Sequence, residues 1–316
     1  MSDRNNPARG SASYSQYSLM EFMRECPDDA ACLDKLWRER YAPDGHTADC
    51  PKCERSRRFH RVQSRPSYSC DTCGHHLHPT AGTIFHKSST SLHLWFYAIY
   101  LMSSTRCGVS AKHLERELGV TYKTAWRMFN LIRNKLMTED DEPLSGEVEI
   151  DETSVDGKPR KRSGPIKRPN AISEGVQLAE RRRATVYAAV ERGGCVKATV
   201  LPSRRGPRLR QQAVEWVDPE SIVFTDEWPY YNKLREDFAE HRRIRHSAHE
   251  YVIGDTHTNT IEGFFGNLKT GIRGNYKAIS HKWLQGYLNE FTWRYNHRHD
   301  ARAMFHTLIE RAAAPA

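Results

Sequence analysis

Long apolar runs are missing from this chain of 316 residues. The longest nearly apolar stretch, residues 92–102, contains His93 and is much shorter than the roughly 20 residues that a membrane-spanning helix needs. The N-terminus, with Asp3, Arg4 and Pro7, lacks the apolar core of a signal peptide. No internal repeat is visible. These absences argue against a membrane or secreted protein and predict one that works inside a reducing cell.

Cysteine pairing of the kind found in secreted proteins is also missing. Four of the eight cysteines (Cys26, Cys32, Cys107 and Cys195) have no matching framework. The other four form two CxxC knuckles, Cys50 with Cys53 and Cys70 with Cys73, separated by 16 residues. This spacing predicts a zinc ribbon in which four thiolates bind one Zn²⁺. His75 and His76 lie close enough to be alternative ligands.

Acidic residues are absent from several basic runs. The chain carries a net charge of +9, and the run from Lys158 to Arg168 holds six cations and no acid. Further cations follow at residues 181–183 and 204–210. Such a charge favours a polyanionic partner. With no membrane segment in the sequence, we expect that partner to be nucleic acid.

Residues 92–137 predict helices that end in a helix-turn-helix. Ser110 and Thr121 are suitable helix N-caps, and Gly119 lies at the turn between the two helices. The second helix has an apolar stripe made of Ala125, Phe129, Ile132 and Leu136. The opposite face carries cations and amides without an acid, as expected of a helix that enters a major groove: Lys123, Arg127, Asn130 and Asn134.

Three acidic residues stand far apart in the sequence where different elements can bring them together. Asp151 ends the alternating run 147–150, which predicts a strand, and Asp226 ends a second predicted strand, 221–225. Glu262 lies where a helix opens, with 35 residues between it and Asp226. Three carboxylates at one point can hold two hard divalent cations for in-line phosphoryl transfer. The neighbouring Glu152 and Glu227 should point to the opposite strand face.

The helix around Glu262 has two distinct faces at about 100° per residue. One face is apolar and should pack on a sheet: Ile261, Phe264, Phe265, Leu268 and Ile272. The other is polar, with a glycine that leaves room for close approach: Asn259, Glu262, Gly266, Lys269 and Arg273. This second face suits an active site.

The C-terminal half predicts alternating strands and helices. Strands are expected at 147–151, 184–190, 196–201 and 221–225, and helices at 209–217, 230–238, around Glu262 and at 283–295. A short segment near Ile244 lies between the last strand and the Glu262 helix. This order predicts an α/β domain with a mixed sheet and helices on both faces. Ahead of it, residues 18–24 and 28–40 predict two short helices that dock on the zinc ribbon.

The three acids, with Lys269 seven residues after the glutamate, resemble the D,D-35-E active site of DNA transposases and retroviral integrases. From about residue 18 to 300 the chain is similar to bacterial insertion-sequence transposases, in the group related to eukaryotic Merlin elements. The matching stretches are CPKC, CDTC, LGVTYKTAWRM, VEIDET, FTDEWPYY and HTNTIEGFFGNLK. Asparagine can replace the glutamate in such relatives, but Glu262 makes the triad complete here.

The resemblance implies a multidomain α/β protein. Its expected parts are an N-terminal tail with short helices (1–45), a zinc ribbon (46–86), a helix-turn-helix unit (87–144) and a ribonuclease H-like, mixed-sheet DDE catalytic domain (145–316).

The implied activity is that of a DNA transposase. Such an enzyme binds the terminal inverted repeats, cleaves at the transposon ends and joins the 3′-OH to target DNA by two-metal phosphoryl transfer. Two Mg²⁺ (or Mn²⁺) per active site would be held by Asp151, Asp226 and Glu262, and one structural Zn²⁺ by the cysteines. Lys269 would hold a phosphate near the scissile bond, as Asn259 or His257 also could, although a structural role suits His257 equally. The other expected DNA contacts are Tyr122, Lys123, Arg127, Asn130, Asn134 and Arg273.

The expected partners are transposon-end DNA and target DNA. A homodimer or larger oligomer is also expected, in the bacterial cytoplasm and associated with the nucleoid. Two other functions are weighed against this one. A structure-specific Mg²⁺-dependent nuclease would use the same carboxylates but would not need a sequence-reading unit. A zinc-ribbon and helix-turn-helix transcription regulator would not depend on the three acids.

Overall fold

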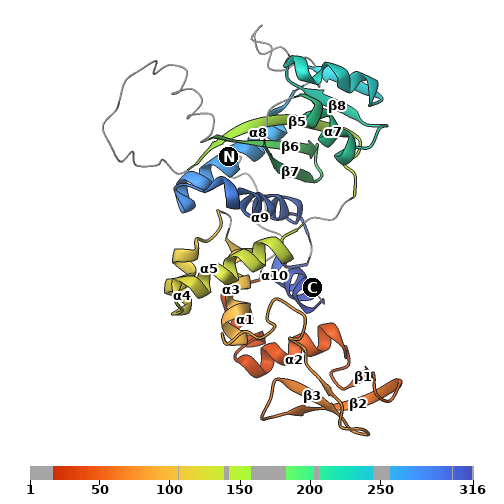
Figure 1. The fold of residues 1–316 in the computed structure, drawn as a ribbon, viewed down its shortest axis with the longest axis vertical. Helices are drawn as coiled ribbons and strands as arrows, with labels where there is room; N and C mark the ends of the chain where they lie inside the picture. The colour runs from red at the N-terminus through yellow and green to blue at the C-terminus, as the bar shows by residue number, and fades with distance from the viewer. Residues whose placement is uncertain are drawn as a thin grey trace, which may run out of the picture. The chain divides into compact units, whose positions relative to one another are not determined.

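The computed structural model describes residues 17–105, 107–138, 142–157, 183–202, 206–244, 257–300 and 302–314. The basic residues at 158–168, 181–182 and 204–205 lie outside this description. The chain divides into two compact units, Met1–Met137 with His297–Ala316, and Thr138–Asn296 (Figure 1). No helix among the described residues combines the length and apolar character needed to cross a membrane.

The first unit begins with two short helices and a small sheet. Helix α1 (Leu19–Glu25) starts at a capping box in which Ser18 and Glu21 satisfy each other's backbone N–H groups. Helix α2 (Asp29–Arg40) follows. Strands β1 (Thr47–Cys50), β2 (Arg55–Val62), β3 (Ser67–Cys70) and β4 (His76–Leu77) form an antiparallel sheet in the order β1-β2-β3-β4.

The two short helices pack in different places. Trp37 of α2 stacks on Tyr68 of β3 with ring centroids 4.1 Å apart, so α2 docks on the small sheet as predicted. Phe22 of α1 instead stacks on Tyr100 and meets Phe305 edge-on. The prediction that α1 also docks on the ribbon is therefore wrong. Phe22, the only buried residue of α1, packs in an aromatic cluster elsewhere in this unit.

The rest of the first unit is helical. Helix α3 (Leu92–Ser104) is followed by α4 (Ala111–Leu118), α5 (Tyr122–Leu131) and the π-helical turn η1 (Ile132–Leu136). The last helix, α10 (Met304–Ala313), packs against α3 and α2. Residues 297–316 thus belong to the first unit, although the predicted catalytic domain spanned 145–316. The apolar side chains of α10 pack on α3, among them Phe305 against Phe96.

The second unit is built on a five-stranded mixed sheet in the order β7-β6-β5-β8-β9. The strands are β5 (Glu147–Asp156), β6 (Arg183–Glu191), β7 (Val196–Leu201), β8 (Ile222–Thr225) and β9 (Glu240–Arg243). Strands β5, β8 and β9 are parallel, while β6 is antiparallel to both β5 and β7. The mixed sheet predicted from the sequence is confirmed.

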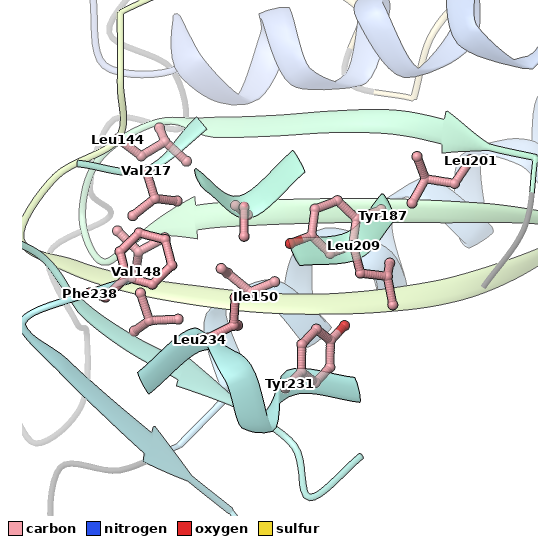
Figure 2. Close-up of a cluster of buried hydrophobic side chains, with 13 residues drawn as sticks. Leu144, Val148, Ile150, Tyr187, Leu201, Leu209, Val217, Tyr231, Leu234 and Phe238 are labelled. Carbon is pink, nitrogen blue, oxygen red and sulfur yellow. The ribbon is translucent and has the colours of Figure 1, made fainter. Parts of the chain in front are cut away.

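Helices cover both faces of this sheet. Val148 and Ile150 of β5 point to one face, where they join Leu209 of α7 (Gly206–Trp216) and Leu234 of the 3₁₀ helix η2 (Pro229–Glu236) in a buried core (Figure 2). The alternate residues point to the other face, against α8 (Asn259–Gly271). The π-helical turn η4 (Ile272–Tyr276), the 3₁₀ turn η5 (His281–Trp283) and α9 (Leu284–Asn296) complete the unit.

Three predicted elements differ in form from the observed ones. The strand expected to end at Asp151 continues to Asp156, because β6 pairs with it along that whole length. The segment expected as a helix at 230–238 is 3₁₀ rather than α, and begins with Pro229. The short segment near Ile244 contains strand β9, which ends directly before that residue, and Ile244 is fully buried.

Candidate active site

The sheet brings Asp151 and Asp226 to neighbouring positions. Asp151 lies within β5, and Asp226 directly follows β8, the parallel neighbour of β5. The last paired residues are Glu149 and Phe224, and continuing that register by two residues places Asp226 beside Asp151. The same two-residue step keeps Asp151 on the face of β5 that carries Glu149, which is the face against α8.

Helix α8 brings the third carboxylate to the same place. Glu262 lies in its first turn and is exposed. The backbone N–H of the preceding residue, Ile261, donates to the carboxylate of Glu149 on β5 at 3.0 Å. The structure therefore gathers Asp151, Asp226 and Glu262 from a strand, a strand end and a helix.

Each of these carboxylates accepts a hydrogen bond from its own segment. Asp151 accepts from the backbone N–H of Glu152 at 2.8 Å, and Asp226 accepts from the backbone N–H of Trp228 at 2.9 Å. Glu262 accepts from the hydroxyl of Thr258 at 3.4 Å. None of these bonds is to a cation, so the negative charge of the cluster is not neutralised by them.

Burial and the surrounding negative charge both favour the protonated form of Asp151. Burial, together with the charges of Glu152, Asp226 and Glu262, raises the pKa of Asp151 to about 8, against the opposing effect of the hydrogen bond from the Glu152 N–H. Because the charges of Asp226 and Glu262 both act on Asp151, the three carboxyl groups lie close enough to interact. Hard divalent cations bind oxygen ligands of this kind, and a cation would relieve the repulsion. The donor set therefore fits a divalent metal.

The two faces of α8, continued by the first residues of η4, agree with the prediction. Ile261, Phe264, Phe265, Leu268 and Ile272 are all buried. On the opposite face Asn259, Glu262, Gly266 and Arg273 are exposed, and Lys269 is partly exposed. Lys269 lies about two turns beyond Glu262 on the same face, since seven residues at about 100° return almost to the starting direction.

Glu152, the residue directly after Asp151, points away from the site. The hydroxyl of Tyr231, which belongs to the buried core on the α7 face, donates a hydrogen bond to Glu152. The predicted alternation of Glu152 and Asp151 is therefore confirmed. Burial and the proximity of Tyr187 and Glu152 hold the pKa of Tyr231 well above its usual range, so its hydroxyl keeps its proton.

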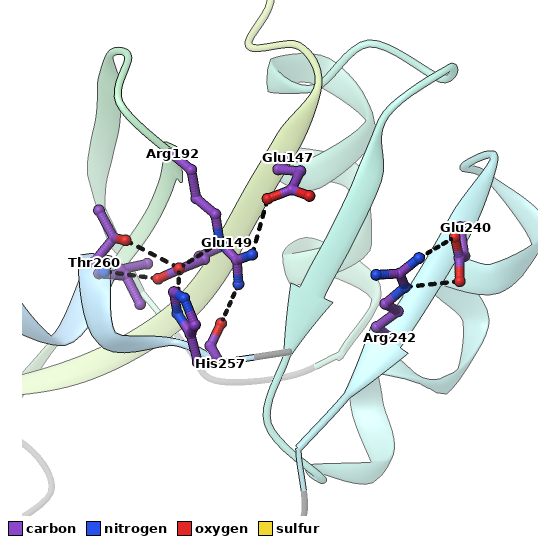
Figure 3. A network of polar contacts seen from close by, with 8 residues as sticks. Glu147, Glu149, Arg192, Glu240, Arg242, His257 and Thr260 are labelled. Carbon is purple, nitrogen blue, oxygen red and sulfur yellow. Dashed lines mark hydrogen bonds and ion pairs between the residues drawn. The ribbon is translucent and has the colours of Figure 1, made fainter. Parts of the chain in front are cut away.

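Glu149, two residues before Asp151, has a buried environment that was not predicted from the sequence. Its side chain is fully buried, and it contacts Arg192, Thr260, Ile261 and His257 (Figure 3). His257 thus has a structural contact, with its Nδ1 3.1 Å from Glu149. The sequence shows only that Glu149 lies between the apolar Val148 and Ile150. The alternation of a strand predicts that a charged side chain at such a position is exposed, so its burial could not be inferred.

Four cysteines of the first unit form a compact cluster: Cys50, Cys53, Cys70 and Cys73. Their sulfur atoms all lie within 4.8 Å of one another, with Cys50 and Cys73 3.5 Å apart and Cys53 and Cys70 4.0 Å apart. Four sulfurs around one Zn²⁺ lie about 3.8 Å apart, whereas a disulfide is about 2 Å long. Cys50, Cys53, Cys70 and Cys73 form no disulfide. The cluster is compatible with a zinc ribbon, and neither His75 nor His76 belongs to it.

Among the described residues, these cysteines are the one group of three or more His, Cys, Asp or Glu side chains whose ligand atoms approach so closely. The three carboxylates are spread more widely than a single compact cation site. Two cations in a shared site lie about 3.5–4 Å apart, which requires a wider set of ligands.

The helices α4 and α5 have the predicted caps and turn. Ser110 accepts from the N–H of His113 at 3.1 Å, Thr121 accepts from the N–H of Thr124 at 3.3 Å, and Gly119 has a φ of 63°. The predicted apolar stripe is buried: Ala125, Phe129, Ile132 and Leu136.

The opposite face of α5 is open to solvent. Lys123 and Arg127 are exposed there, and Tyr122 is 47% exposed. Asn130 and Asn134 each donate their side-chain amide to a carbonyl of their own helix, at 3.0 and 2.8 Å. Those two amides must therefore rotate before they can donate to another molecule, whereas Lys123 and Arg127 are already positioned at the surface.

Comparisons with known proteins find similar sequences. Residues 143–296 match the family described as ISXO2-like transposase domain, and this segment nearly coincides with the second unit. The chain is 29% identical over 255 residues to an uncharacterized protein in transposable element ISH50 of Halobacterium salinarum, covering 78% of this chain and 84% of that protein. It is 31% identical over 101 residues to an uncharacterized transposase-like protein of Haemophilus influenzae, covering 32% of this chain and 80% of that protein. No solved structure matches the chain significantly.

Proposed function

We propose a specific reaction for this chain, which belongs to the insertion-sequence transposases with an ISXO2-like transposase domain. The proposed reaction is DDE-type DNA transposition. The protein binds the terminal inverted repeats of its element, cleaves at the transposon ends and joins the freed 3′-OH to target DNA. The observation that carries the proposal is the gathering of Asp151, Asp226 and Glu262 from β5, the end of β8 and α8.

The sheet of the second unit supports a ribonuclease H-like assignment. Its central strand β5 is flanked by an antiparallel hairpin on one side and two parallel strands on the other, in the order β7-β6-β5-β8-β9. This arrangement puts Asp151 on β5 and Asp226 directly after the neighbouring parallel strand β8, and leaves the third acid to a helix on one face.

Each acidic residue has a definite part in the proposed mechanism. Two Mg²⁺ (or Mn²⁺) ions, when bound, activate the attacking oxygen and stabilise the leaving oxygen of an in-line displacement. Asp151 and Asp226 hold the cations from the sheet, and Glu262 completes the ligand set from α8. Lys269, on the same face of α8, holds a phosphate near the scissile bond. Asn259 and Arg273, both exposed, extend this DNA contact along the helix.

The first unit supplies DNA selection in this proposal. One Zn²⁺ held by Cys50, Cys53, Cys70 and Cys73 maintains the ribbon, and α4 with α5 forms a helix-turn-helix. Lys123 and Arg127 contact DNA from the exposed face of α5, and Tyr122, Asn130 and Asn134 lie beside them. Two transposon ends must be held together for joining, so the active form is a homodimer or larger oligomer.

The test is a strand-transfer assay with purified protein, a duplex carrying the element's end, a target plasmid and Mg²⁺. We expect covalent joining of the end to the plasmid, and none in the presence of EDTA. Cleavage without any joining would favour a structure-specific nuclease instead. Sequence-selective binding with no metal-dependent chemistry would favour a transcription regulator.

Two variants in this assay separate selection from chemistry. A base contact contributes about 1–3 kcal/mol of discrimination, whereas a phosphate contact carries little sequence information. Arg127→Ala should therefore lower the preference for end DNA over random duplex about 5-fold or more, since each 1.4 kcal/mol is tenfold. Lys269→Ala should keep that preference and slow joining. The opposite pattern would contradict this division of roles.

The pKa of Asp151 predicts how metal binding depends on pH. With its folded pKa raised to about 8, Asp151 keeps its proton between about pH 4 and 8 while the unfolded chain has lost it. The metal-free protein is therefore stabilised at the low end of this range and loses that stability as pH rises through 8. Below pH 8, Mg²⁺ must displace the proton in order to bind.

Thermal unfolding with and without Mg²⁺ measures this competition. The rise in Tm on adding Mg²⁺ should be larger at pH 8.5 than at pH 6.5, by about 2–4 °C for each kcal/mol of binding free energy. Asp151→Asn, which has no proton to lose, should show no Mg²⁺-dependent rise at either pH. A rise independent of pH in the wild type would contradict the assignment of Asp151 as a ligand.

A further inference from the structure

Glu149 is a fully buried carboxylate whose partners lie on two separate segments, the turn after β6 and residues 257–261. It accepts hydrogen bonds from the Nε of Arg192 at 2.9 Å, the hydroxyl of Thr260 at 3.0 Å and the backbone N–H of Ile261 at 3.0 Å. The Nδ1 of His257 lies 3.1 Å away. An ionised group is costly to bury unless it is paired and hydrogen-bonded, and Glu149 is both (Figure 3).

The carboxylate of Glu149 caps α8 from outside the helix. The first backbone N–H groups of a helix lack partners inside it, and a side chain at the N-cap usually accepts from one of them. Thr258, at the N-cap of α8, makes no such bond. Glu149 accepts from Ile261 instead, and its negative charge is favourable at a helix N-terminus.

Arg192 neutralises Glu149 and extends the connection. Its Nη1 donates to Glu147 at 2.9 Å, its Nη2 donates to the carbonyl of His257 at 2.8 Å, and its guanidinium lies over the ring of Phe224 at 3.9 Å. One side chain thus joins β5, β8 and the residue before the α8 N-cap. Because Arg192 balances the charge of Glu149, β5 can hold this buried carboxylate although Asp151 lies only two residues further along the strand.

We propose that Glu149 is a positioning residue that sets the place of Glu262 relative to Asp151. Glu149 and Asp151 are alternate residues on one face of β5, about 7 Å apart along the strand. Glu262 directly follows the residue whose N–H is bound to Glu149. One strand thereby supplies a metal ligand and also the contact that places the opposing ligand. This inference rests on the proposed two-metal function of the site.

The test compares two buried glutamates that contact opposite ends of the helical segment formed by α8 and η4. Glu290, fully buried on α9, pairs with Arg294 and accepts from the Tyr276 hydroxyl at 3.2 Å in the turn that follows α8. Glu149→Gln and Glu290→Gln are therefore matched in chemistry and burial. Only the first alters the end of α8 that carries Glu262.

Metal binding is measured in two ways. Mn²⁺ binding to the full-length protein without DNA is followed by electron paramagnetic resonance, and the Mg²⁺ concentration for half-maximal strand transfer is taken from activity. Replacement of a residue that orients a metal ligand typically weakens metal affinity about 10–100-fold. We expect Glu149→Gln to raise both midpoints about 10-fold, with the joining rate at saturating Mg²⁺ largely recovered, and Glu290→Gln to raise neither.

Unchanged midpoints in folded Glu149→Gln, or equal rises in both variants, would overturn the inference. A second variant, Thr260→Val, keeps the test valid if Glu149→Gln does not fold, because it removes one hydrogen bond to Glu149 from the helix side. It should raise the Mn²⁺ midpoint about 2–5-fold. No rise in Thr260→Val would also overturn the inference. A wild type that binds no Mn²⁺ and joins no strands would overturn the proposed function and this inference together. A wild type that binds Mn²⁺ beside an unshifted Glu149→Gln would overturn this inference alone.

Discussion

Asp226→Asn is expected to abolish cleavage and joining of transposon-end DNA in Mg²⁺ while leaving end binding close to that of the wild type. Asparagine keeps the size of the side chain and can still accept from the N–H of Trp228, which bonds Asp226 at 2.9 Å. It loses the negative charge that a hard cation requires. If about 4 kcal/mol of transition-state stabilisation is lost, the rate falls about a thousandfold.

The control is another aspartate-to-asparagine change in the same unit. Asp237 pairs with Arg210 at 2.6 Å, on the segment that follows η2. Asp237→Asn should lower stability slightly and leave the joining rate within about twofold, because a partly exposed ion pair contributes about 1 kcal/mol or less. Gel-based strand transfer and filter binding on both variants give the comparison. An Asp226→Asn protein that joins strands at the normal rate would remove Asp226 from the active site.

The helix with Glu262 was predictable because its pattern is local. Its five apolar residues repeat with the helical period, and all five are buried. The polar stripe could be drawn before any fold was known, and Glu262, Asn259 and Arg273 are exposed as expected. Asp226 was equally accessible, since a short apolar run leads directly to it.

The environment of Glu149 could not be predicted because its partners are remote. Arg192 is 43 residues away and Thr260 is 111 residues away. Local alternation places Glu149 on a polar strand face, yet α8 covers that face. Whether such a carboxylate is solvated or buried depends on which cation the fold brings to it, and no local pattern contains that information.

The length of β5 was underestimated for a related reason. After Asp151 the strand contains Glu152, Thr153 and Ser154, which do not continue the apolar alternation. Their backbones are nevertheless paired with β6, as far as Asp156 against Arg183. Backbone pairing needs a neighbouring strand rather than apolar side chains, so Asp151 lies inside the strand and not at its end.

The four-cysteine cluster leads to the second prediction with a large expected effect. Cys50 and Cys70 are almost fully buried and belong to the small core formed with Trp37, Phe59 and Tyr68. Zn²⁺ bound to four thiolates contributes about 10–16 kcal/mol in small zinc domains, as much as the total stability of a typical domain. Without the metal, the thiols would be left in a core too small to hold the sheet.

Purified protein should therefore contain one tightly held Zn²⁺ per chain, and Cys50→Ser with Cys53→Ser should lose it. The ribbon should then become sensitive to proteolysis between β1 and β4, and binding of transposon-end DNA should weaken by about tenfold or more, which corresponds to about 1.4 kcal/mol. The matched control is Cys107→Ser with Cys195→Ser, because both of these cysteines are exposed and lie outside the cluster. That variant should keep its zinc and its DNA affinity. Zinc is measured by atomic emission on undenatured protein, and a double mutant at Cys50 and Cys53 that retains a full equivalent would show that the knuckles do not share one metal.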